Sequence, residues 1–322
     1  MENRNASTPA TLQKAIEYFS NPDHAFEYMV AMRWPDGVTC FHCGGKDHVF
    51  ISTRKIWRCK ACRKQFSLKR GTIMECSPLS LDKWVITFWS LANMKNGISS
   101  YELARSIGVC QKTAWFLLHR TRHIMATQDF TGKLDGIVEA DEHYHGGLEA
   151  NKHESRKRKA GRGGVGKVIV VGVMKRGGDV RVKIVPDTSK AAIHQFVNDN
   201  VEEGSGLHTD EHASYSGLDE KFIHDSVNHS AHEYVKNETV HCNSMENFWS
   251  LLSRIFAGTY ISCDAAHLHR YLAEQVLRYD MRKAGDKRGR GGDAERFECV
   301  VSRVAGRRLT FKALLAENQI GV

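Results

Sequence analysis

The chain has 322 residues, enough for two or three domains that each bury a core of their own. Hydrophobic residues make up 41% of it, as in soluble globular proteins, and no apolar run approaches the roughly 20 residues that a membrane-spanning helix needs. The net charge is +9, with 46 Lys and Arg residues against 37 Asp and Glu residues. This excess favours a polyanionic partner, although it does not separate DNA from RNA or from an acidic membrane surface. The N-terminus lacks the apolar core of a secretory signal, so we expect a cytoplasmic protein with no membrane partner.

Two short helices are expected near the N-terminus. Apolar residues recur at helical spacing between residues 11 and 33. The sequence Asn21-Pro-Asp interrupts this pattern, because proline is a strong breaker of regular structure. We therefore expect one helix before Asn21 and another after it.

Four of the nine cysteines form two pairs, each with two residues between its cysteines. Fifteen residues separate the pairs, a spacing at which two knuckles bind one tetrahedral Zn²⁺ ion through four thiolates. Four protein ligands leave no position for water, so we expect the zinc to be structural. The ligands would be Cys40, Cys43, Cys59 and Cys62. We expect His42 to be a solvated turn residue, and the five scattered cysteines to be small buried apolar residues.

Residues 79–125 have a helical pattern throughout. Helices are expected at residues 81–92, 98–107 and 111–122, with Gly108 in the short turn before the last one. A helix, a glycine-bearing turn and a second helix form the helix-turn-helix arrangement, whose last helix contacts DNA with its N-terminus. In this interpretation Gln111, Lys112 and Thr113 contact base edges or phosphates. The alternative is a three-helix packing unit that makes no contact with DNA.

The remaining sequence predicts strands and helices in alternation. Strands are expected at residues 138–144, 167–174, 180–185 and 207–210, and helices at residues 191–201, from Glu246 onward and at residues 267–281. This order of elements begins with a sheet that contains a hairpin and continues with a helix, a further strand and more helices. It is typical of an RNase H-like α/β fold. Residues 283–292 are rich in glycine and charge and should form a loop, and residues 303–319 a last helix or a partly ordered tail.

Three acidic residues each lie in a segment suited to presenting a carboxylate. Asp141 lies on a buried strand that ends at Gly146 and Gly147, Asp210 ends a short strand, and Glu246 opens a helix. A carboxylate on a central strand is costly unless it binds a cation or a strong donor. Two carboxylates on strands and a third on a helix can converge on a pair of Mg²⁺ ions, which promote phosphodiester chemistry.

Neighbouring acids compete for the two strand positions. Glu139 is a weaker rival of Asp141, and we expect both Glu139 and Glu142 to point away from Asp141 across the strand. Glu211 competes with Asp210. A strand that buries Leu207 turns Asp210 to the opposite face, so periodicity alone does not decide between Asp210 and Glu211.

The helix that begins near Glu246 carries two further candidates. Asn243 lies about one turn earlier and is a substitute ligand for Mg²⁺ through its carbonyl oxygen, although it brings no charge. Arg254 lies two turns further along, where a cation would be near the scissile phosphate. Pairing with solvent or backbone is an equally good explanation for Arg254.

A basic loop follows the strand that carries Asp141. Seven Lys or Arg residues lie between residues 152 and 167, and we expect them to contact backbone phosphates. The candidates within this loop are Arg156, Lys157, Arg158 and Lys159. A solvated turn is the alternative. Several histidines lie close to the three acids in sequence and suggest phosphate contacts or proton transfer, but none of them stands out.

In these segments the chain resembles the insertion-sequence transposases of the DDE class, specifically the zinc-ribbon-bearing group of bacterial mobile elements. The matching stretches lie within residues 15–282. They include the zinc ribbon and residues 140–147 (Ala-Asp-Glu-His-Tyr-His-Gly-Gly), 185–189, 208–215, 229–235, 243–252, 258–260 and 267–271.

The resemblance implies a DNA transposase. It implies Mg²⁺-dependent cleavage at terminal inverted repeats and strand transfer into target DNA, with Mn²⁺ as a possible substitute and with Asp141, Asp210 and Glu246 as ligands of two metal ions. The partners would be double-stranded DNA of the element ends and the target, and a second copy of the chain in a dimer or larger assembly on the nucleoid. The family often has Lys seven residues after its third acid, where this chain has Ser253 followed by Arg254. This departure leaves open whether the copy is active, so an RNase H-like nuclease and an inactive DNA-binding regulator are the alternatives.

Four regions are expected along the chain. Residues 1–78 would hold the N-terminal helices and the zinc ribbon, and residues 79–130 the helix-turn-helix-like DNA-binding region. Residues 131–282 would form the RNase H-like catalytic domain. Residues 283–322 would be a basic C-terminal extension.

Overall fold

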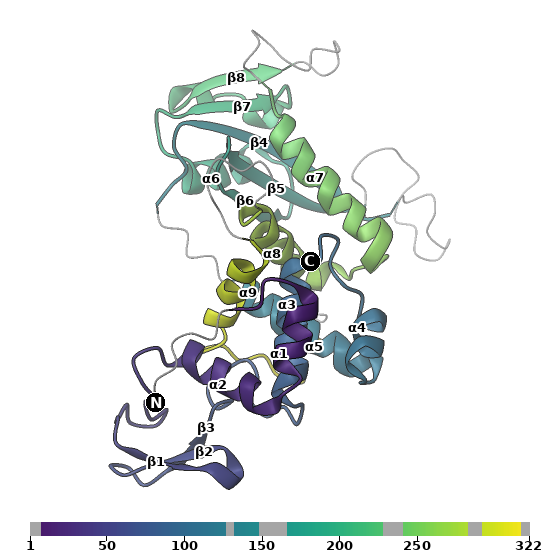
Figure 1. Ribbon diagram of the computed structural model, residues 1–322. Helices are drawn as coiled ribbons and strands as arrows, with labels where there is room; N and C mark the ends of the chain where they lie inside the picture. The colour runs from purple at the N-terminus through teal and green to yellow at the C-terminus, as the bar shows by residue number, and fades with distance from the viewer. Residues whose placement is uncertain (1–7, 127–131, 148–165, 228–240, 283–291, 317–322) are drawn as a thin grey trace. The chain divides into compact units, whose positions relative to one another are not determined.

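The computed structural model describes residues 8–126, 132–147, 166–227, 241–282 and 292–316 (Figure 1). The chain divides into two compact units. The helical unit contains Met1–Gln128, Gly258–Ile261 and Ala273–Ile320, and the sheet unit contains Asp129–Ala257 and Ser262–Leu272 together with the last two residues. Among the described residues, no helix has the length and apolar character that crossing a membrane requires.

The helical unit begins with two short helices and a small sheet. Helix α1 (Leu12–Phe19) and helix α2 (Pro22–Arg33) are separated as expected, and the Asn21 side chain caps α2 by accepting a hydrogen bond from the Asp23 N–H. Strands β1 (His48–Ile51), β2 (Ile56–Cys59) and β3 (Gln65–Ser67) form a three-stranded antiparallel sheet. The first cysteine pair, Cys40 and Cys43, precedes β1. In the second pair, Cys59 ends β2 and Cys62 lies between β2 and β3.

Three helices follow, close to the positions predicted from the sequence. They are α3 (Leu81–Asn93), α4 (Ser100–Ile107) and α5 (Gln111–Met125). Ser99 and Glu102 form a capping box that fixes the start of α4. Gly108 ends α4 in the left-handed conformation, with φ of 63°. Helices α4 and α5 are therefore joined by a short glycine-bearing turn, as the sequence predicts.

The C-terminal segment contributes to the core of the helical unit, which the expectation of a basic extension did not anticipate. Helix α9 (Asp293–Ser302) and helix α10 (Phe311–Ala316) bury Phe297, Val300 and Leu314 in the same cluster as residues of α1 to α5. Helix α9 was not predicted, although its apolar residues recur at helical spacing. Its neighbourhood of glycine and charged residues concealed that pattern.

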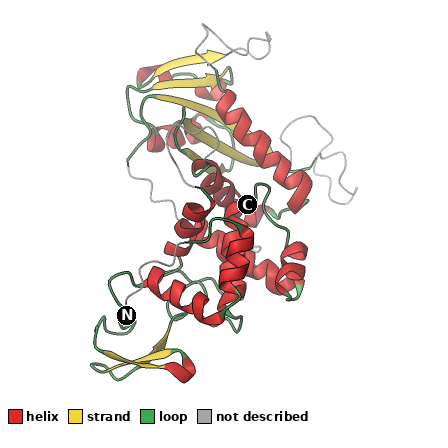
Figure 2. Ribbon diagram, in the orientation of Figure 1, coloured by secondary structure: helices red, strands yellow, loops and turns green. Residues whose placement is uncertain are grey.

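The sheet unit is built around a five-stranded mixed sheet (Figure 2). Strands β4 (Ile137–His145), β5 (Val168–Lys175) and β6 (Val180–Val185) pair antiparallel in a meander. Strand β7 (Gly206–Asp210) pairs parallel with β4, and β8 (Ile223–Val227) pairs parallel with β7. The strand order is β6-β5-β4-β7-β8, which is the RNase H-like arrangement with β4 at the centre.

Strand β8 was missed in the sequence. It lies at the edge of the sheet, and its residues alternate poorly between apolar and polar character. Ile223, for example, is 67% exposed. An edge strand pairs on one side only, so it does not need the apolar pattern that identifies a central strand.

Helices cover both faces of the sheet. Helix α6 (Lys190–Asn200) packs Ile193, Phe196 and Val197 on the face where β4 presents Val138 and Ala140. Helix α7 (Asn243–Ile255) packs on the opposite face, where Gly172 of β5 leaves room for its side chains. Helix α7 begins three residues before the predicted start at Glu246. Helix α8 (Leu268–Asp280) follows and closely matches its predicted range.

Candidate active site

The central strand β4 presents acids to both faces of the sheet. Asp141 pairs with Gly172 of β5, so it lies on the α7 face. Glu139 is two residues away and lies on that same face, where it accepts hydrogen bonds from the first turn of α7. The expectation that Glu139 points away from Asp141 was therefore wrong, because side chains alternate with a period of two along a strand. Glu142 does point to the opposite face.

Three carboxylates gather where β4 and β7 lie side by side. Oxygen atoms of Asp141, Glu142 and Asp210 all lie within 4.8 Å of one another. Asp210 lies on the face opposite to buried Leu207, and its Oδ1 accepts a hydrogen bond of 2.9 Å from the His212 N–H. The structure thus brings together the two strand acids that the sequence singled out.

The negative charges of the carboxylates at this site repel one another. Burial, followed by the charges of Glu142, Asp210 and Glu246, raises the pKa of Asp141 to about 8. A hydrogen bond of 2.9 Å from the Glu142 N–H to Asp141 Oδ1 acts in the other direction but is outweighed. A bound cation would relieve this repulsion, and carboxylate oxygens are the ligands that Mg²⁺ prefers. The donor set therefore fits a divalent metal ion.

Helix α7 carries Glu246, the third acid that the sequence singled out, and Glu246 is not a member of the cluster of carboxylates within 4.8 Å of one another. Glu246 lies in the first turn of α7 and is exposed, and its charge contributes to the raised pKa of Asp141. Asn243 is the first residue of α7 and is also exposed. Arg254 lies near the end of the helix, exposed, and donates a hydrogen bond of 3.1 Å from Nη2 to Ser250 Oγ.

Glu142 is a member of the cluster that sequence reasoning did not assign. Its Oε2 accepts a hydrogen bond of 2.9 Å from the hydroxyl of Tyr215, which is 2% exposed. Burial and the charge of Asp210 raise the pKa of Glu142. The signal for Glu142 in the sequence was its position directly after Asp141. Adjacent residues of a strand lie on opposite faces, but their side chains are still close in space.

Two of the nearby histidines pack against aromatic rings. His143 stacks on Trp249, with ring centroids 5.2 Å apart, and His145 lies 4.3 Å from the Phe256 ring. Burial, together with the charges of His145 and Lys167, lowers the pKa of His143 to about 4. His143 is therefore uncharged near neutral pH and is better suited to packing than to binding phosphate.

The four paired cysteines converge in the small N-terminal sheet. Cys40 Sγ lies 3.7 Å from Cys62 Sγ, and Cys43 Sγ lies 3.6 Å from Cys59 Sγ. Four thiolates in tetrahedral geometry around a zinc ion at about 2.3 Å would lie about 3.8 Å apart. The sulfur positions therefore fit one zinc ion, and they are far too distant for disulfide bonds.

The expected DNA-reading residues lie at the start of α5. Gln111 donates a hydrogen bond of 2.8 Å from Nε2 to Ser100 Oγ of α4. Lys112 Nζ lies 5.0 Å from the centre of the Phe311 ring. The start of α5 is thus partly covered by side chains of α4 and α10 and is not a bare surface. The basic-loop candidates Arg156, Lys157, Arg158 and Lys159 lie outside the described residues.

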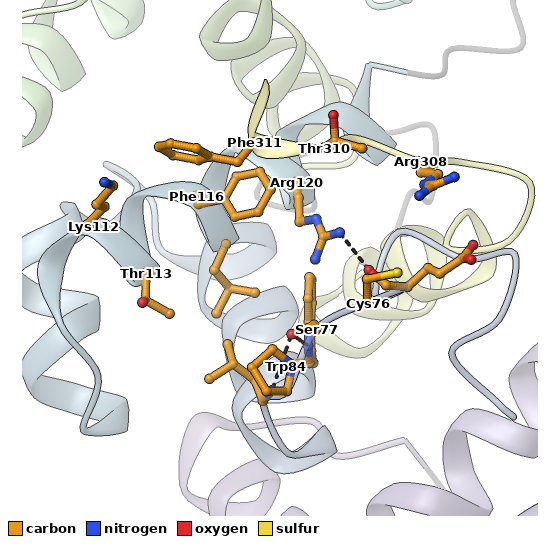
Figure 3. Close-up of a pocket in the computed structure, with 14 residues that line it drawn as sticks. Cys76, Ser77, Trp84, Lys112, Thr113, Phe116, Arg120, Arg308, Thr310 and Phe311 are labelled. Carbon is orange, nitrogen blue, oxygen red and sulfur yellow. Dashed lines mark hydrogen bonds between the residues drawn. The ribbon is translucent and has the colours of Figure 1, made fainter. Parts of the chain in front are cut away.

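Lys112 and Thr113 line a cavity of about 510 Å³ within the helical unit (Figure 3). Its walls combine cations with aromatic rings. Arg120 is 6% exposed and lies 4.7 Å from the Phe116 ring and 5.6 Å from the Trp84 ring, and its Nη2 donates to the Glu75 carbonyl. Arg308 completes the cationic side. Three cations, Lys112, Arg120 and Arg308, and one acid, Glu75, therefore line this cavity.

Comparisons with known proteins identify two parts of the chain. Residues 133–280 match the ISXO2-like transposase domain, and residues 20–65 match the transposase zinc-ribbon domain. The second match includes all four paired cysteines. The first includes Asp141, Asp210 and Glu246. Together the two matches span more than half of the chain.

The chain is also similar to one curated protein and to solved structures. It is 27% identical over 285 residues, 84% of this chain and 95% of the other, to an uncharacterized protein in transposable element ISH50 of Halobacterium salinarum. The Mos1 strand transfer complex is 13% identical, covering 68% of this chain and 78% of the other, with a TM-score of 0.31. A simian T-cell lymphotropic virus intasome in complex with PP2A regulatory subunit B56 gamma is 10% identical, covering 56% of this chain and 64% of the other, with a TM-score of 0.28. The RNase H-like fold is identified by the strand order of the sheet. With its zinc-ribbon and transposase domains, the chain belongs to the zinc-ribbon-bearing group of DDE insertion-sequence transposases.

Proposed function

We propose that this chain cleaves DNA at the ends of a mobile element and joins those ends to target DNA. The observation that carries the proposal is the approach of the Asp141 and Asp210 carboxylates within 4.8 Å on neighbouring strands. The electrostatic effect of Glu246 on Asp141 supports a third ligand on α7. We propose Asp141, Asp210 and Glu246 as metal ligands, with Asn243 able to assist through its carbonyl oxygen.

When bound, a pair of Mg²⁺ or Mn²⁺ ions would promote attack by a water or a 3′-hydroxyl on a phosphodiester and would stabilise the leaving oxygen. The protein residues provide the support for this chemistry. Strands β4 and β7 hold two ligands on a rigid sheet, and the hydrogen bond from the His212 N–H orients the Asp210 carboxylate. We propose Arg254, two turns along α7 from Glu246, as a phosphate contact.

The proposed partners are double-stranded DNA and a second copy of the chain. The net charge of +9 favours a polyanionic partner. We propose that the DNA contacts are made by Gln111, Lys112, Thr113, the basic loop with Arg156, Lys157, Arg158 and Lys159, and Arg254. The four paired cysteines would hold a structural zinc ion. Joining two element ends requires at least two copies, so light scattering should detect a dimer or larger assembly on paired end-DNA. A monomer on that DNA would contradict this part of the proposal.

The test is a cleavage and joining assay on labelled duplexes that carry the flanking genomic repeats. In Mg²⁺ or Mn²⁺ the protein should cut at the repeat end, leave a 3′-hydroxyl and produce joined target DNA. Asp210→Asn should bind the same duplex without cutting it. Glu211→Gln is the matched control, because it removes an exposed acid next to Asp210, and its cleavage rate should stay within a few-fold of the original.

The assay also separates the alternatives. Cleavage without joining would identify a nuclease of the same fold. Sequence-specific binding without any metal-dependent cleavage would identify a DNA-binding regulator. Cleavage that is retained in Asp210→Asn would remove the proposed metal site from the chemistry.

A further inference from the structure

Glu139 is a buried carboxylate beside the proposed metal site, and the metal site does not explain it. Its side chain is fully buried, and Glu139 is not a member of the cluster formed by Asp141, Glu142 and Asp210. A carboxylate buried to this extent is strongly unfavourable unless donors and a cation surround it. The contacts of Glu139 should therefore reveal its role.

Both oxygen atoms of Glu139 are bound by the first turn of α7. Oε2 accepts hydrogen bonds from the backbone N–H groups of Ser244, at 2.8 Å, and Met245, at 3.1 Å. Oε1 accepts a hydrogen bond of 3.0 Å from the Ser244 hydroxyl. Three of the donors to this strand carboxylate thus belong to two consecutive helix residues.

The start of α7 needs such an acceptor. The first N–H groups of a helix have no partner within the helix, and their dipoles favour a negative charge. Cys242 occupies the N-cap position of α7, and its side chain makes no capping hydrogen bond. Glu139 supplies from β4 the capping carboxylate that the sequence next to α7 does not provide.

Arg176 and His241 complete the surroundings of Glu139. Arg176 Nε donates to Glu139 Oε1 at 3.1 Å, and its Nη2 donates to the His241 carbonyl at 3.2 Å. His241 Nδ1 lies 3.4 Å from the same Glu139 oxygen. Arg176 therefore links the carboxylate to His241, two residues before α7, and balances its charge, which makes Glu139 a poor competitor for a metal ion.

This contact joins the strand and the helix that carry the proposed metal ligands. Glu139 is two residues before Asp141 on the same face of β4, and Met245 is directly followed by Glu246 on α7. Fixing Ser244 and Met245 to β4 thus fixes the backbone that carries the third acid relative to the strand that carries the first.

We propose that Glu139 is a positioning residue: it caps α7 from the neighbouring strand and sets the distance between Glu246 and Asp141, and it is not itself a metal ligand. This inference rests on the proposed function for its consequence in catalysis. Its structural content is independent of any activity and can be tested without DNA.

The first measurement is amide hydrogen exchange by mass spectrometry on the full-length, zinc-loaded chain without Mg²⁺ or Mn²⁺, in peptides that cover residues 241–249. In Glu139→Ala, exchange in the first turn of α7 should become about 5- to 30-fold faster, as expected for the loss of a helix cap. Glu139→Gln keeps one acceptor oxygen and should show a smaller change. Peptides of β5 serve as the internal control for an intact sheet. If Glu139→Ala does not fold, Glu139→Gln and Arg176→Lys provide the same comparison.

The second measurement is Mn²⁺ binding by titration calorimetry. Glu139→Ala should weaken Mn²⁺ binding by about 10- to 100-fold, the usual effect of removing a group that orients a ligand, without changing the number of bound ions. Asp141→Asn is the reciprocal control and should weaken binding while leaving exchange in residues 241–249 unchanged. Glu139→Gln should recover part of the affinity.

Two results would overturn the proposal. One is unchanged exchange in the first turn of α7 when Glu139 is replaced, since the carboxylate would then not hold the helix. The other is loss of a bound ion in Glu139→Gln with normal exchange, which would make Glu139 a ligand. A protein that neither cuts nor joins DNA would contradict the proposed function, yet its exchange data would still decide the role of Glu139.

Discussion

At the scale of single residues, three acids within four positions of β4 have different surroundings. Glu139 is surrounded by N–H donors and Arg176, Asp141 faces other carboxylates, and Glu142 accepts a hydrogen bond from Tyr215. The alternation of the strand separates Glu142 from the other two. Position along the strand then separates Glu139, under the start of α7, from Asp141, beside Asp210. The same chemical group thus has three different surroundings within one strand.

We expect Glu142→Gln to be much less harmful than Asp141→Asn. The Gln carbonyl can still accept the Tyr215 hydrogen bond, and removing the charge of Glu142 relieves one cause of the raised pKa of Asp141. Single-turnover cleavage of end-DNA should fall by no more than about tenfold in Glu142→Gln. It should fall by on the order of 10³-fold or more in Asp141→Asn. Equal losses in the two variants would place Glu142 among the metal ligands.

Site residues could be predicted from the sequence where the pattern lay within a short stretch of the chain. Asp141 and Asp210 were identified from their places on strands, and the four cysteines from their spacing. The role of Glu139 could not be predicted, because it depends on a helix start more than 100 residues further along the chain. The expected start of α7 at Glu246 also placed Ser244 and Met245 outside the helix, and so hid the N–H groups that Glu139 binds.

At the scale of elements, the position of α7 depends on a glycine in the sheet. Gly172 pairs with Asp141, and a Cβ atom there would lie 2.5 Å from Met245 Cε and 2.8 Å from Trp249 Cζ2. The methionine end can move aside, but the tryptophan ring is packed and stacks on His143. The absence of a side chain at Gly172 therefore allows α7 to lie close to the acids of β4.

Gly172→Ala should displace α7 and weaken metal binding without abolishing the fold. Inserting one methyl group into a packed contact should destabilise the protein by about 1–3 kcal/mol. Mn²⁺ affinity should fall as Glu246 moves away from Asp141. Thermal unfolding and calorimetry would measure the two effects. Gly258→Ala is the matched control, since a Cβ there meets nothing within 4 Å, and it should change neither quantity. Unchanged Mn²⁺ binding in Gly172→Ala would show that the close approach of α7 is not needed.

At the scale of the whole molecule, helices from the N-terminal and C-terminal parts of the described chain share one core. Residues of α1 to α5 and of the C-terminal helices α9 and α10 share a single buried cluster in the helical unit. Periodicity predicted most of the individual helices, but it does not report which helices share a core. A segment that follows a charged, glycine-rich stretch was therefore expected to be an extension, although it carries the buried residues Phe297 and Val300.

A buried ion network lies within the helical unit and ties these distant segments together. Glu274 is fully buried and accepts a hydrogen bond of 2.6 Å from Arg122 Nε and another from Arg278. The Tyr260 hydroxyl donates to the same carboxylate at 2.5 Å. Burial alone would raise the pKa of Glu274, but the charges of Arg278 and Arg122 outweigh it, and the pKa lies below its usual value.

The sign of the pH dependence follows from this lowered pKa. Above the unfolded pKa of about 4.3 the ionised Glu274 stabilises the folded state, and this contribution is lost as the pH falls through the lower folded pKa. Glu274→Gln leaves two arginines without their counter-charge, so at pH 7 it should destabilise the helical unit by about 3–5 kcal/mol. The difference between Glu274→Gln and the original protein should shrink as the pH falls below about 4, as measured by denaturant unfolding.

The exposed pair of Glu203 and Lys221 in the sheet unit provides the comparison. Glu203→Gln removes the same type of charge from a solvated site, where screening leaves an ion pair with little effect on stability. Its unfolding should therefore stay close to that of the original protein at every pH. A Glu274→Gln difference that stays constant down to pH 3 would mean that packing around residue 274, and not its charge, stabilises the helical unit. The contrast between the two variants separates a buried charge that connects distant parts of the chain from a surface charge that does not.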